Sequence, residues 1–154
     1  MSGTSSSRSG GCQCGAIRFR AEALGEASIC HCRMCQKATG GLFGPYVSVK
    51  LAELVWSRGE RKRFQSSNKV WRGFCEACGT PLTFEYQGGP AILGLAIGAL
   101  DDPAAAFPTE QLGSPSKLPW ADDLPNLPVH EPTEPRAAAH LASIATLQHP
   151  DHDT

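Results

Sequence analysis

The stretch Ile29 to Gly41, ICHCRMCQKATGG, holds three closely spaced cysteines, Cys30, Cys32 and Cys35. Thiolates at such short spacings can bind one metal ion, and zinc is a metal that protein thiolates commonly hold. A closed structural zinc site has four ligands, whereas a catalytic site has three and leaves one position open. These three cysteines, here called the trio, are therefore either part of a larger closed site or the protein side of an open one.

The other four cysteines form two close pairs, Cys12 with Cys14 and Cys75 with Cys78, and a glycine directly follows each pair. Glycine permits the tight turns that let two thiolates reach one zinc ion at about 2.3 Å. We expect these four, here called the quartet, to form one closed structural zinc site. That site would close a long loop and add to the free energy of folding.

With the quartet closed, the trio has three ligands and several possible arrangements. An exchangeable fourth position would make it a catalytic zinc site. Alternatively, His31 or the distant His130 could complete a second closed site, or Cys32 and Cys35 could act as a redox pair. His31 stands between two ligands in the sequence, which favours a side chain that points away from the metal.

Three thiolates leave a bound zinc ion with a net negative formal charge, so it is a weaker Lewis acid than a zinc held by three histidines. A thiol is softer and more acidic than water and is the more natural fourth ligand. The trio thus favours a substrate thiolate that attacks a carbonyl carbon, or the reverse cleavage of a carbon–sulfur bond.

The elements that must position these cysteines read mainly as short strands separated by Gly, Pro, Ser and Asn. Such runs occupy residues 17–20, 43–49, 53–57, 62–67, 69–74, 82–86 and 91–100. Helical signals are limited to short turns at 32–41 and 101–107. The pattern predicts an all-β fold of small zinc-stabilised sheets with short helical turns.

The composition divides the chain into three parts. Residues 1–9 are rich in Ser and Gly and are expected to be disordered, and residues 10–130 form the zinc domain. From Gln111 the sequence is rich in proline and acidic residues, which indicates an extended arm. Residues 131–154 are expected to be a flexible or partly helical tail.

The charge balance and the cysteine count exclude several classes of protein. With 14 basic and 15 acidic residues, the chain lacks the cationic surplus that nucleic-acid binding needs. No apolar run is long enough for a membrane span, and the N-terminus lacks the apolar core of a secretion signal. We therefore expect a cytoplasmic protein without membrane or nucleic-acid partners. An odd number of cysteines, seven, does not suit a disulfide framework there.

Five segments in this order resemble the glutathione-dependent formaldehyde-activating enzyme family, also called the Gfa-like or centromere protein V family: GGCQCGAIRF, CHCRMCQKATGG, FQSSNKVWRGFCEACGTPL, IGALDDP and KLPWADDLP. The resemblance covers about residues 10–128. It implies a β-tent fold with two zinc ions per chain, a structural one on the quartet and a catalytic one on the trio. It also implies glutathione and formaldehyde as substrates.

A thiol such as glutathione carries two carboxylates, so its pocket should present cations and hydrogen-bond donors near the trio. The candidates are Arg33, Lys37 and Arg72. Trp120, in the proline-rich arm, either covers the pocket or anchors the arm. Polar residues that could donate further hydrogen bonds lie at the end of the predicted strand 62–67: Ser66, Ser67 and Asn68.

The resulting functional hypothesis is a zinc-dependent carbon–sulfur lyase, similar to S-(hydroxymethyl)glutathione synthase. It would condense a glutathione-like thiol with formaldehyde or a related small aldehyde to an S-hydroxymethyl adduct, or catalyse the reverse. The alternative is a non-catalytic zinc module that carries a thiol ligand or binds a protein partner.

Overall fold

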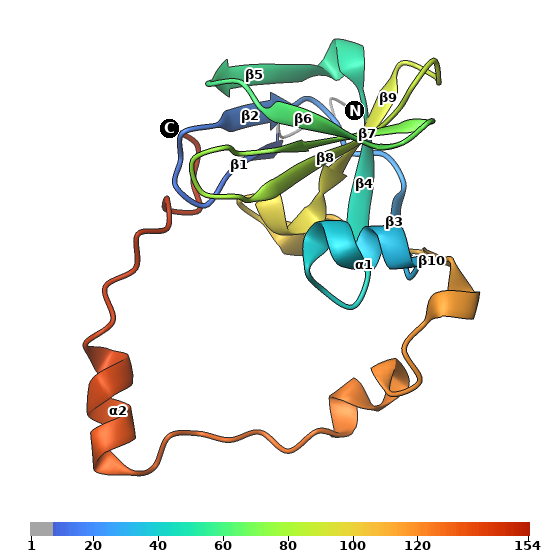
Figure 1. Ribbon diagram of the computed structural model, residues 1–154. Coiled ribbons are helices and arrows are strands. Elements are labelled where there is room, and N and C mark those ends of the chain that lie inside the picture. The colour runs from blue at the N-terminus through green and yellow to red at the C-terminus, as the bar shows by residue number, and fades with distance from the viewer. Residues whose placement is uncertain (1–7) are drawn as a thin grey trace, which may run out of the picture.

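Two β-sheets form the body of the protein in the computed structural model, which describes residues 8–154 (Figure 1). The smaller sheet has the order β1-β2-β5 and the larger one β10-β3-β4-β9-β8-β7-β6. The strands are β1 (Arg8–Gly11), β2 (Arg18–Ala21), β3 (Ala27–Cys30), β4 (Gly44–Lys50), β5 (Leu54–Arg58), β6 (Lys62–Ser67), β7 (Val70–Phe74), β8 (Pro81–Tyr86), β9 (Ile92–Ala96) and β10 (Glu110–Leu112). The prediction of a mostly β fold with few short helices is confirmed.

The core follows the period-two pattern of the strands. Val47 and Val49 on β4, and Leu93 and Leu95 on β9, are buried, and Val47 pairs with Leu95 in the antiparallel register. Full burial of such a side chain contributes roughly 1.5–3 kcal/mol. In the smaller sheet, Phe19 is also fully buried. The core therefore holds the sheets in fixed positions, and the turns that carry cysteines lie at the ends of their strands.

Two α-helices and five short 3-10 turns complete the structure. The α-helices are α1 (Arg33–Thr39) and α2 (Pro135–Ala142), and the 3-10 turns are Leu51–Glu53, Ile97–Ala99, Pro103–Ala105, Ser114–Ser116 and Ala121–Asn126. Helix α1 begins at the N-cap Cys32, whose sulfur accepts a hydrogen bond from the backbone of Cys35. It ends at Gly40, which has the left-handed φ of 68° that favours glycine.

Three strands, β1, β3 and β10, lie outside the segments predicted as strand. β3 and β10 pair in parallel, with Glu110 opposite Ser28 and Leu112 opposite Cys30. Each is only three or four residues long and lacks a clear alternation, so the local pattern does not reveal it. Their pairing matters for the site because it joins the start of the C-terminal arm to the strand that carries Cys30.

The N-terminal boundary also differs from the prediction. Residues 8 and 9 belong to β1, where Arg8 pairs with Ala21 and Ser9 with Arg20. The Ser9 hydroxyl donates a hydrogen bond to the carboxylate of Asp101. These long-range contacts fix residues that composition alone assigns to the disordered lead-in, while residues 1–7 of that lead-in lie outside the described part.

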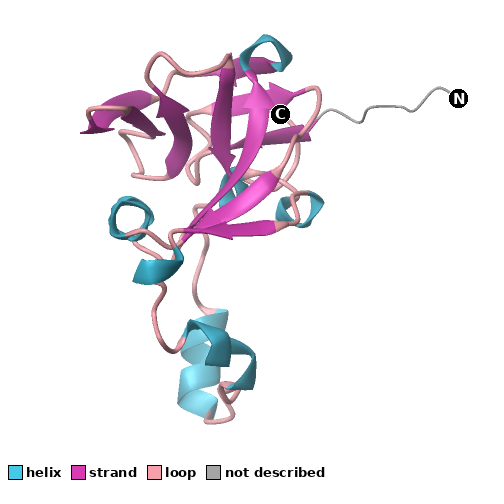
Figure 2. Cartoon of the chain, turned by 90° about the vertical axis from the view of Figure 1, so that its right-hand side faces the viewer, coloured by secondary structure: helices cyan, strands magenta, loops and turns pink. Residues whose placement is uncertain are grey.

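From Gly113 the chain leaves the sheets as an arm, and α2 lies apart from them in both views (Figures 1 and 2). All residues of α2 are exposed. The last residues return to the smaller sheet, where Asp153 pairs with Arg20 at 2.7 Å. Within residues 8–154, no helix combines the length and the apolar character needed to cross a membrane.

Candidate metal centre

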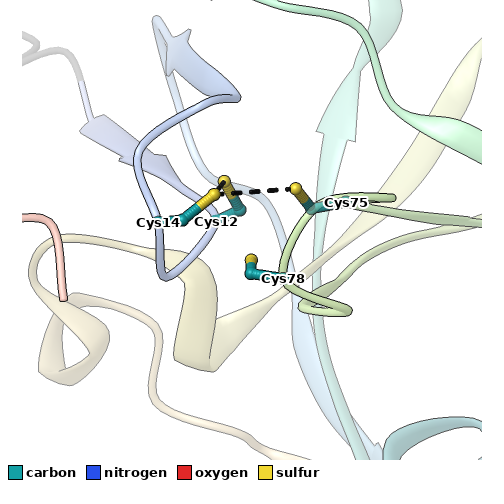
Figure 3. Close-up of side chains that lie close together, drawn as sticks. All are labelled: Cys12, Cys14, Cys75 and Cys78. Atoms are coloured by element: carbon teal, nitrogen blue, oxygen red, sulfur yellow. Dashed lines mark hydrogen bonds between the residues drawn. The ribbon is translucent and has the colours of Figure 1, made fainter. Parts of the chain in front are cut away.

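The quartet comes together from two turns that belong to different sheets. Cys12 and Cys14 lie between β1 and β2, and Cys75 and Cys78 lie between β7 and β8. Their four sulfur atoms lie within 4.8 Å of one another. Figure 3 shows the four side chains converging on one point.

The sulfur spacing in the quartet suits a tetrahedral ion. The Sγ atoms of Cys12 and Cys14 are 3.6 Å apart, and those of Cys14 and Cys75 are 3.9 Å apart. Four ligands at the Zn–S distance of about 2.3 Å would be separated by about 3.8 Å. All seven cysteines of the chain are free thiols. The quartet could therefore hold a zinc ion as a closed four-thiolate site.

Local backbone geometry shapes both turns of the quartet. Gly15 has a φ of 77° and Gly79 a φ of 80°, values that favour glycine. The backbone N–H of Ile17 donates a hydrogen bond to the sulfur of Cys12 over 3.2 Å. Such N–H donors stabilise a thiolate in the position where a metal needs it.

The thiols of the quartet differ in acidity before any metal is bound. Burial raises the pKa of Cys12 to about 12. Burial also opposes ionisation of Cys78, but hydrogen bonds from Thr80 and Cys14 outweigh it and lower the pKa of Cys78 to about 6. Because a metal binds thiolates, loading this site must release protons.

The trio lies where β3 ends and α1 begins. Cys30 is the last residue of β3, Cys32 is the N-cap of α1, and Cys35 lies buried in its first turn. Their three sulfur atoms also lie within 4.8 Å of one another. In the described part of the chain, this group contains cysteines only, so it could offer three thiolate ligands to one metal ion.

The trio thiols also differ from ordinary cysteine. Burial raises the pKa of Cys30 to about 12. Burial acts in the same direction on Cys32, but the backbone N–H of Cys35 and the neighbouring thiols outweigh it and hold the pKa of Cys32 below its ordinary value.

Arg72, on the central part of β7, faces the trio from the larger sheet and is only 3% exposed. Its Nη2 donates to the sulfur of Cys35 over 3.3 Å, and its Nη1 donates to the hydroxyl of Tyr46 over 2.9 Å. Its Nε donates to the hydroxyl of Ser66, also over 2.9 Å. The guanidinium thus places a positive charge beside the sulfur of Cys35, where it would offset part of the negative charge of three metal-bound thiolates.

Burial and charge act in opposite directions on this arginine. Burial lowers the pKa of Arg72, but the hydrogen bond to Cys35 and the nearby acidic groups outweigh it and raise the pKa overall. Burial also raises the pKa of the Tyr46 hydroxyl. Both side chains therefore keep their protons at neutral pH.

His31 lies outside the sulfur group, although it separates Cys30 from Cys32 in the sequence. Its side chain is 2% exposed, and its Nε2 lies 2.8 Å from Oε1 of Gln111 on β10. His130 is exposed in the arm and does not join the group either. The histidine alternatives for a closed trio site thus have no support in this geometry.

A cavity of about 280 Å³ adjoins the trio. Cys30 and Cys35 line it, together with residues that are mostly aromatic or aliphatic: Glu26, Ser28, Tyr46, Ser48, Phe84, Tyr86, Pro90, Ile92, Leu93, Gly94 and Leu112. We call this space the trio cavity. It gives a small ligand access to the open side of the sulfur group.

The residues proposed from the sequence as substrate contacts are dispersed. Arg33 and Lys37 line a separate hollow on the outer side of α1, with Met34 and Phe64. Trp120 is 50% exposed at the start of the turn 121–126 and is not among the residues that line the trio cavity. Of these candidates, only Arg72 contacts a trio cysteine in the described structure.

Tyr46 and Phe84 are site residues that the sequence did not single out. Tyr46 stands in a predicted strand and Phe84 in another, and neither has a local motif. The register of β4, β9 and β8 brings both to one face, where their rings lie 5.6 Å apart. Their place in the site follows from the register of these strands, and no residue nearby in the sequence indicates it.

The match to a family model agrees with the resemblance found in the sequence. The family model described as "Glutathione-dependent formaldehyde-activating enzyme" matches residues 7–113. A crystal structure of a Rhodobacter sphaeroides protein is similar, with a TM-score of 0.55 and 21% identity over 67% of this chain and 98% of that one. At this identity the likeness supports the fold alone. The curated proteins contain no match.

Proposed function

The chain belongs to the glutathione-dependent formaldehyde-activating enzyme family, and from this premise we propose that it is a zinc-dependent enzyme of the carbon–sulfur lyase class. It condenses a thiol with formaldehyde or a related small aldehyde, or catalyses the reverse. Two zinc ions per chain are part of the proposal, one held by the quartet and one by the trio. The quartet ion is structural and the trio ion catalytic.

The observation that carries the proposal is the trio cavity, onto which Cys30 and Cys35 open. Three thiolates with a space beside them match a catalytic site, which keeps one position for substrate. Bound there, zinc supplies a Lewis-acidic position that favours the thiolate form of a substrate thiol.

Arg72 and Tyr46 have distinct tasks in this proposal. Arg72 holds Cys35 and balances the negative charge of the trio, so it is a positioning residue. The oxygen of Tyr46 accepts a hydrogen bond from Arg72, and its own O–H proton can therefore donate to a ligand in the cavity. That proton is directed at the aldehyde oxygen, where negative charge develops.

The reaction conserves atoms and electrons without an oxidant or reductant. The substrate sulfur attacks the aldehyde carbon, and a new C–S bond forms while the C=O π pair moves to oxygen. The oxygen then carries the proton that the thiol gave up, and the product is an S-hydroxymethyl thioether. The apolar walls of the cavity limit the water that would compete as a nucleophile.

The test is zinc stoichiometry for the wild type beside turnover of thiol and formaldehyde pairs, followed by the appearance of the S-hydroxymethyl product. Two zinc ions and turnover are expected. Two zinc ions, a bound thiol and no turnover over a panel of aldehydes would instead favour a non-catalytic zinc module that carries a thiol ligand.

A further inference from the structure

The walls of the trio cavity are apolar on both its inner and outer parts. Leu93 is buried at its inner end, and Phe84 packs edge-on against Tyr86 with ring centroids 4.9 Å apart. Towards solvent, Tyr86, Ile92 and Leu112 remain exposed. Large apolar side chains that stay exposed around a cavity mark a binding surface more often than a packing requirement.

The exposed cations nearest this space do not line it. Arg33 and Lys37 line a different hollow, on the outer side of α1. Lys50 pairs with Ile92 across the strands, but its ammonium group lies 2.9 Å from the carboxylate of Glu53. The acid Glu26, in contrast, lines the trio cavity itself.

The buried Arg72 does not supply the missing cation for a carboxylate. It is only 3% exposed, is not among the residues that line the trio cavity, and donates to Cys35, Tyr46 and Ser66. A tripeptide thiol with two carboxylates would have to bring them onto apolar side chains near Glu26, where they would lose hydration without an ionic partner. The charge distribution therefore disfavours glutathione in this cavity.

We propose that the thiol accepted by the trio cavity is a small, uncharged and apolar one, of the aryl or branched alkyl class. The volume of about 280 Å³ supports this assignment because it lies just below the range of most ligand pockets, roughly 300 to 1,000 Å³. This inference rests on the proposed function and names the substrate class of the same site.

The experiment uses the full zinc-loaded chain and compares phenylmethanethiol with glutathione by isothermal titration calorimetry. Benzyl methyl sulfide, which cannot ionise, serves as a third probe that reports the apolar contacts alone. We expect phenylmethanethiol to bind at least about tenfold more tightly than glutathione. We also expect measurable binding of the sulfide.

The Ile92→Lys variant places a cation at the exposed side of the cavity, and Val55→Lys places one on the exposed face of β5 as a matched control. Ile92→Lys should weaken the binding of phenylmethanethiol about tenfold and strengthen the binding of glutathione severalfold. Val55→Lys should change neither affinity. Tighter binding of glutathione by the wild type, or equal effects of the two variants, would overturn the inference.

Turnover with formaldehyde separates this inference from the proposed function. Tight binding of phenylmethanethiol without any turnover would support the substrate class and contradict the enzyme. Efficient turnover of glutathione, with no turnover or binding of the apolar thiol, would support the enzyme and contradict the substrate class.

Discussion

Arg72 on β7 donates a hydrogen bond to the sulfur of Cys35 on α1 over 3.3 Å, so a buried cation of the larger sheet contacts one sulfur atom of the trio. The contact joins residues 37 positions apart. It couples the position of the trio to the register of the sheet, because Arg72 pairs with Phe64 and Phe84 on the flanking strands.

Arg72→Gln should weaken metal binding by the trio and lower the free energy of unfolding by about 3 kcal/mol, since it leaves buried acceptors without their donor. Arg63→Gln, which removes an exposed arginine of β6, is the control, with an expected loss of about 0–1 kcal/mol. Urea unfolding and competition with a zinc chelator measure the two effects. Equal zinc retention in both variants would contradict the role given to Arg72.

Tyr46→Phe should lower kcat by about a hundredfold, because the aldehyde oxygen loses the O–H donor proposed for it. Tyr86→Phe is the matched control, as Tyr86 also lines the trio cavity but lies in its exposed part. Steady-state kinetics with formaldehyde and a saturating thiol measure the change. A similar kcat for the two variants would remove Tyr46 from the mechanism.

Cys32→Ser should lose one of the two zinc ions and the catalytic activity, while the protein stays folded. Serine is a good N-cap, so α1 can still begin at this position. Cys75→Ser should instead lose the quartet ion and, with it, the cooperatively unfolding native structure, because the structural site contributes folding free energy. Metal analysis with circular dichroism distinguishes the two, and loss of the fold in both would contradict the division into a catalytic and a structural site.

Gly113→Ala should weaken metal binding by the trio, because the added methyl group would clash with the backbone of Cys32. Gly113 has a φ of 66°, and a Cβ there would lie 2.7 Å from the backbone nitrogen of Cys32. Gly88 also has a φ of 66° but has open space around it, so Gly88→Ala carries the conformational strain alone. We expect about 1 kcal/mol of destabilisation for Gly88→Ala and more for Gly113→Ala, with faster zinc release only in the latter. Stopped-flow release to a chromogenic chelator provides the comparison.

Glu85→Gln should remove a pH-dependent part of the stability. Burial opposes ionisation of Glu85, but Arg61, Thr83 and Arg63 outweigh it and lower its pKa below the ordinary value of 4.5. A depressed pKa gives stability that is present above the unfolded-state pKa and is lost as the pH falls through the folded-state pKa. The free energy of unfolding of the wild type should therefore exceed that of the variant by about 1–2 kcal/mol at pH 7. The difference should become progressively smaller below about pH 4.5.

Chemical denaturation at several pH values measures this difference. Glu53→Gln serves as the reference because its partner Lys50 lies in solvent, so its difference from the wild type should stay within about 1 kcal/mol throughout. A gap between wild type and Glu85→Gln that widens as the pH falls would contradict the sign of the argument.

The sequence predicted those parts of the site that depend on short spacings. Cysteines two or three positions apart converge locally, so the trio and each pair of the quartet were readable without a structure, whereas the meeting of the two pairs, 61 positions apart, depends on how the sheets pack. The strands from β4 to β8 were readable as well, since each is a run of β-favouring residues bounded by Gly, Pro, Ser or Asn. These features depend on neighbours in the chain.

The rest depends on register between distant strands. Arg33, Lys37 and Arg72 are equivalent as basic residues near the cysteine motifs, yet only Arg72 points to the trio, because β7 carries it inward. Likewise, the pairing of β3 with β10 places Gln111 beside His31 and keeps that imidazole away from the sulfur group. No local pattern distinguishes these outcomes.

The sulfur of Cys32 both starts α1 and belongs to the trio, since it accepts the Cys35 N–H over 3.4 Å. This one sulfur atom therefore links metal binding to helix capping, because a change in its charge alters the hydrogen bond that fixes the first turn of the helix. The amide resonance of Cys35 and its rate of hydrogen exchange should therefore act as a built-in sensor of site occupancy. Through this shared atom, we expect ion loading to change the environment of the first turn of α1 without deciding whether the helix forms.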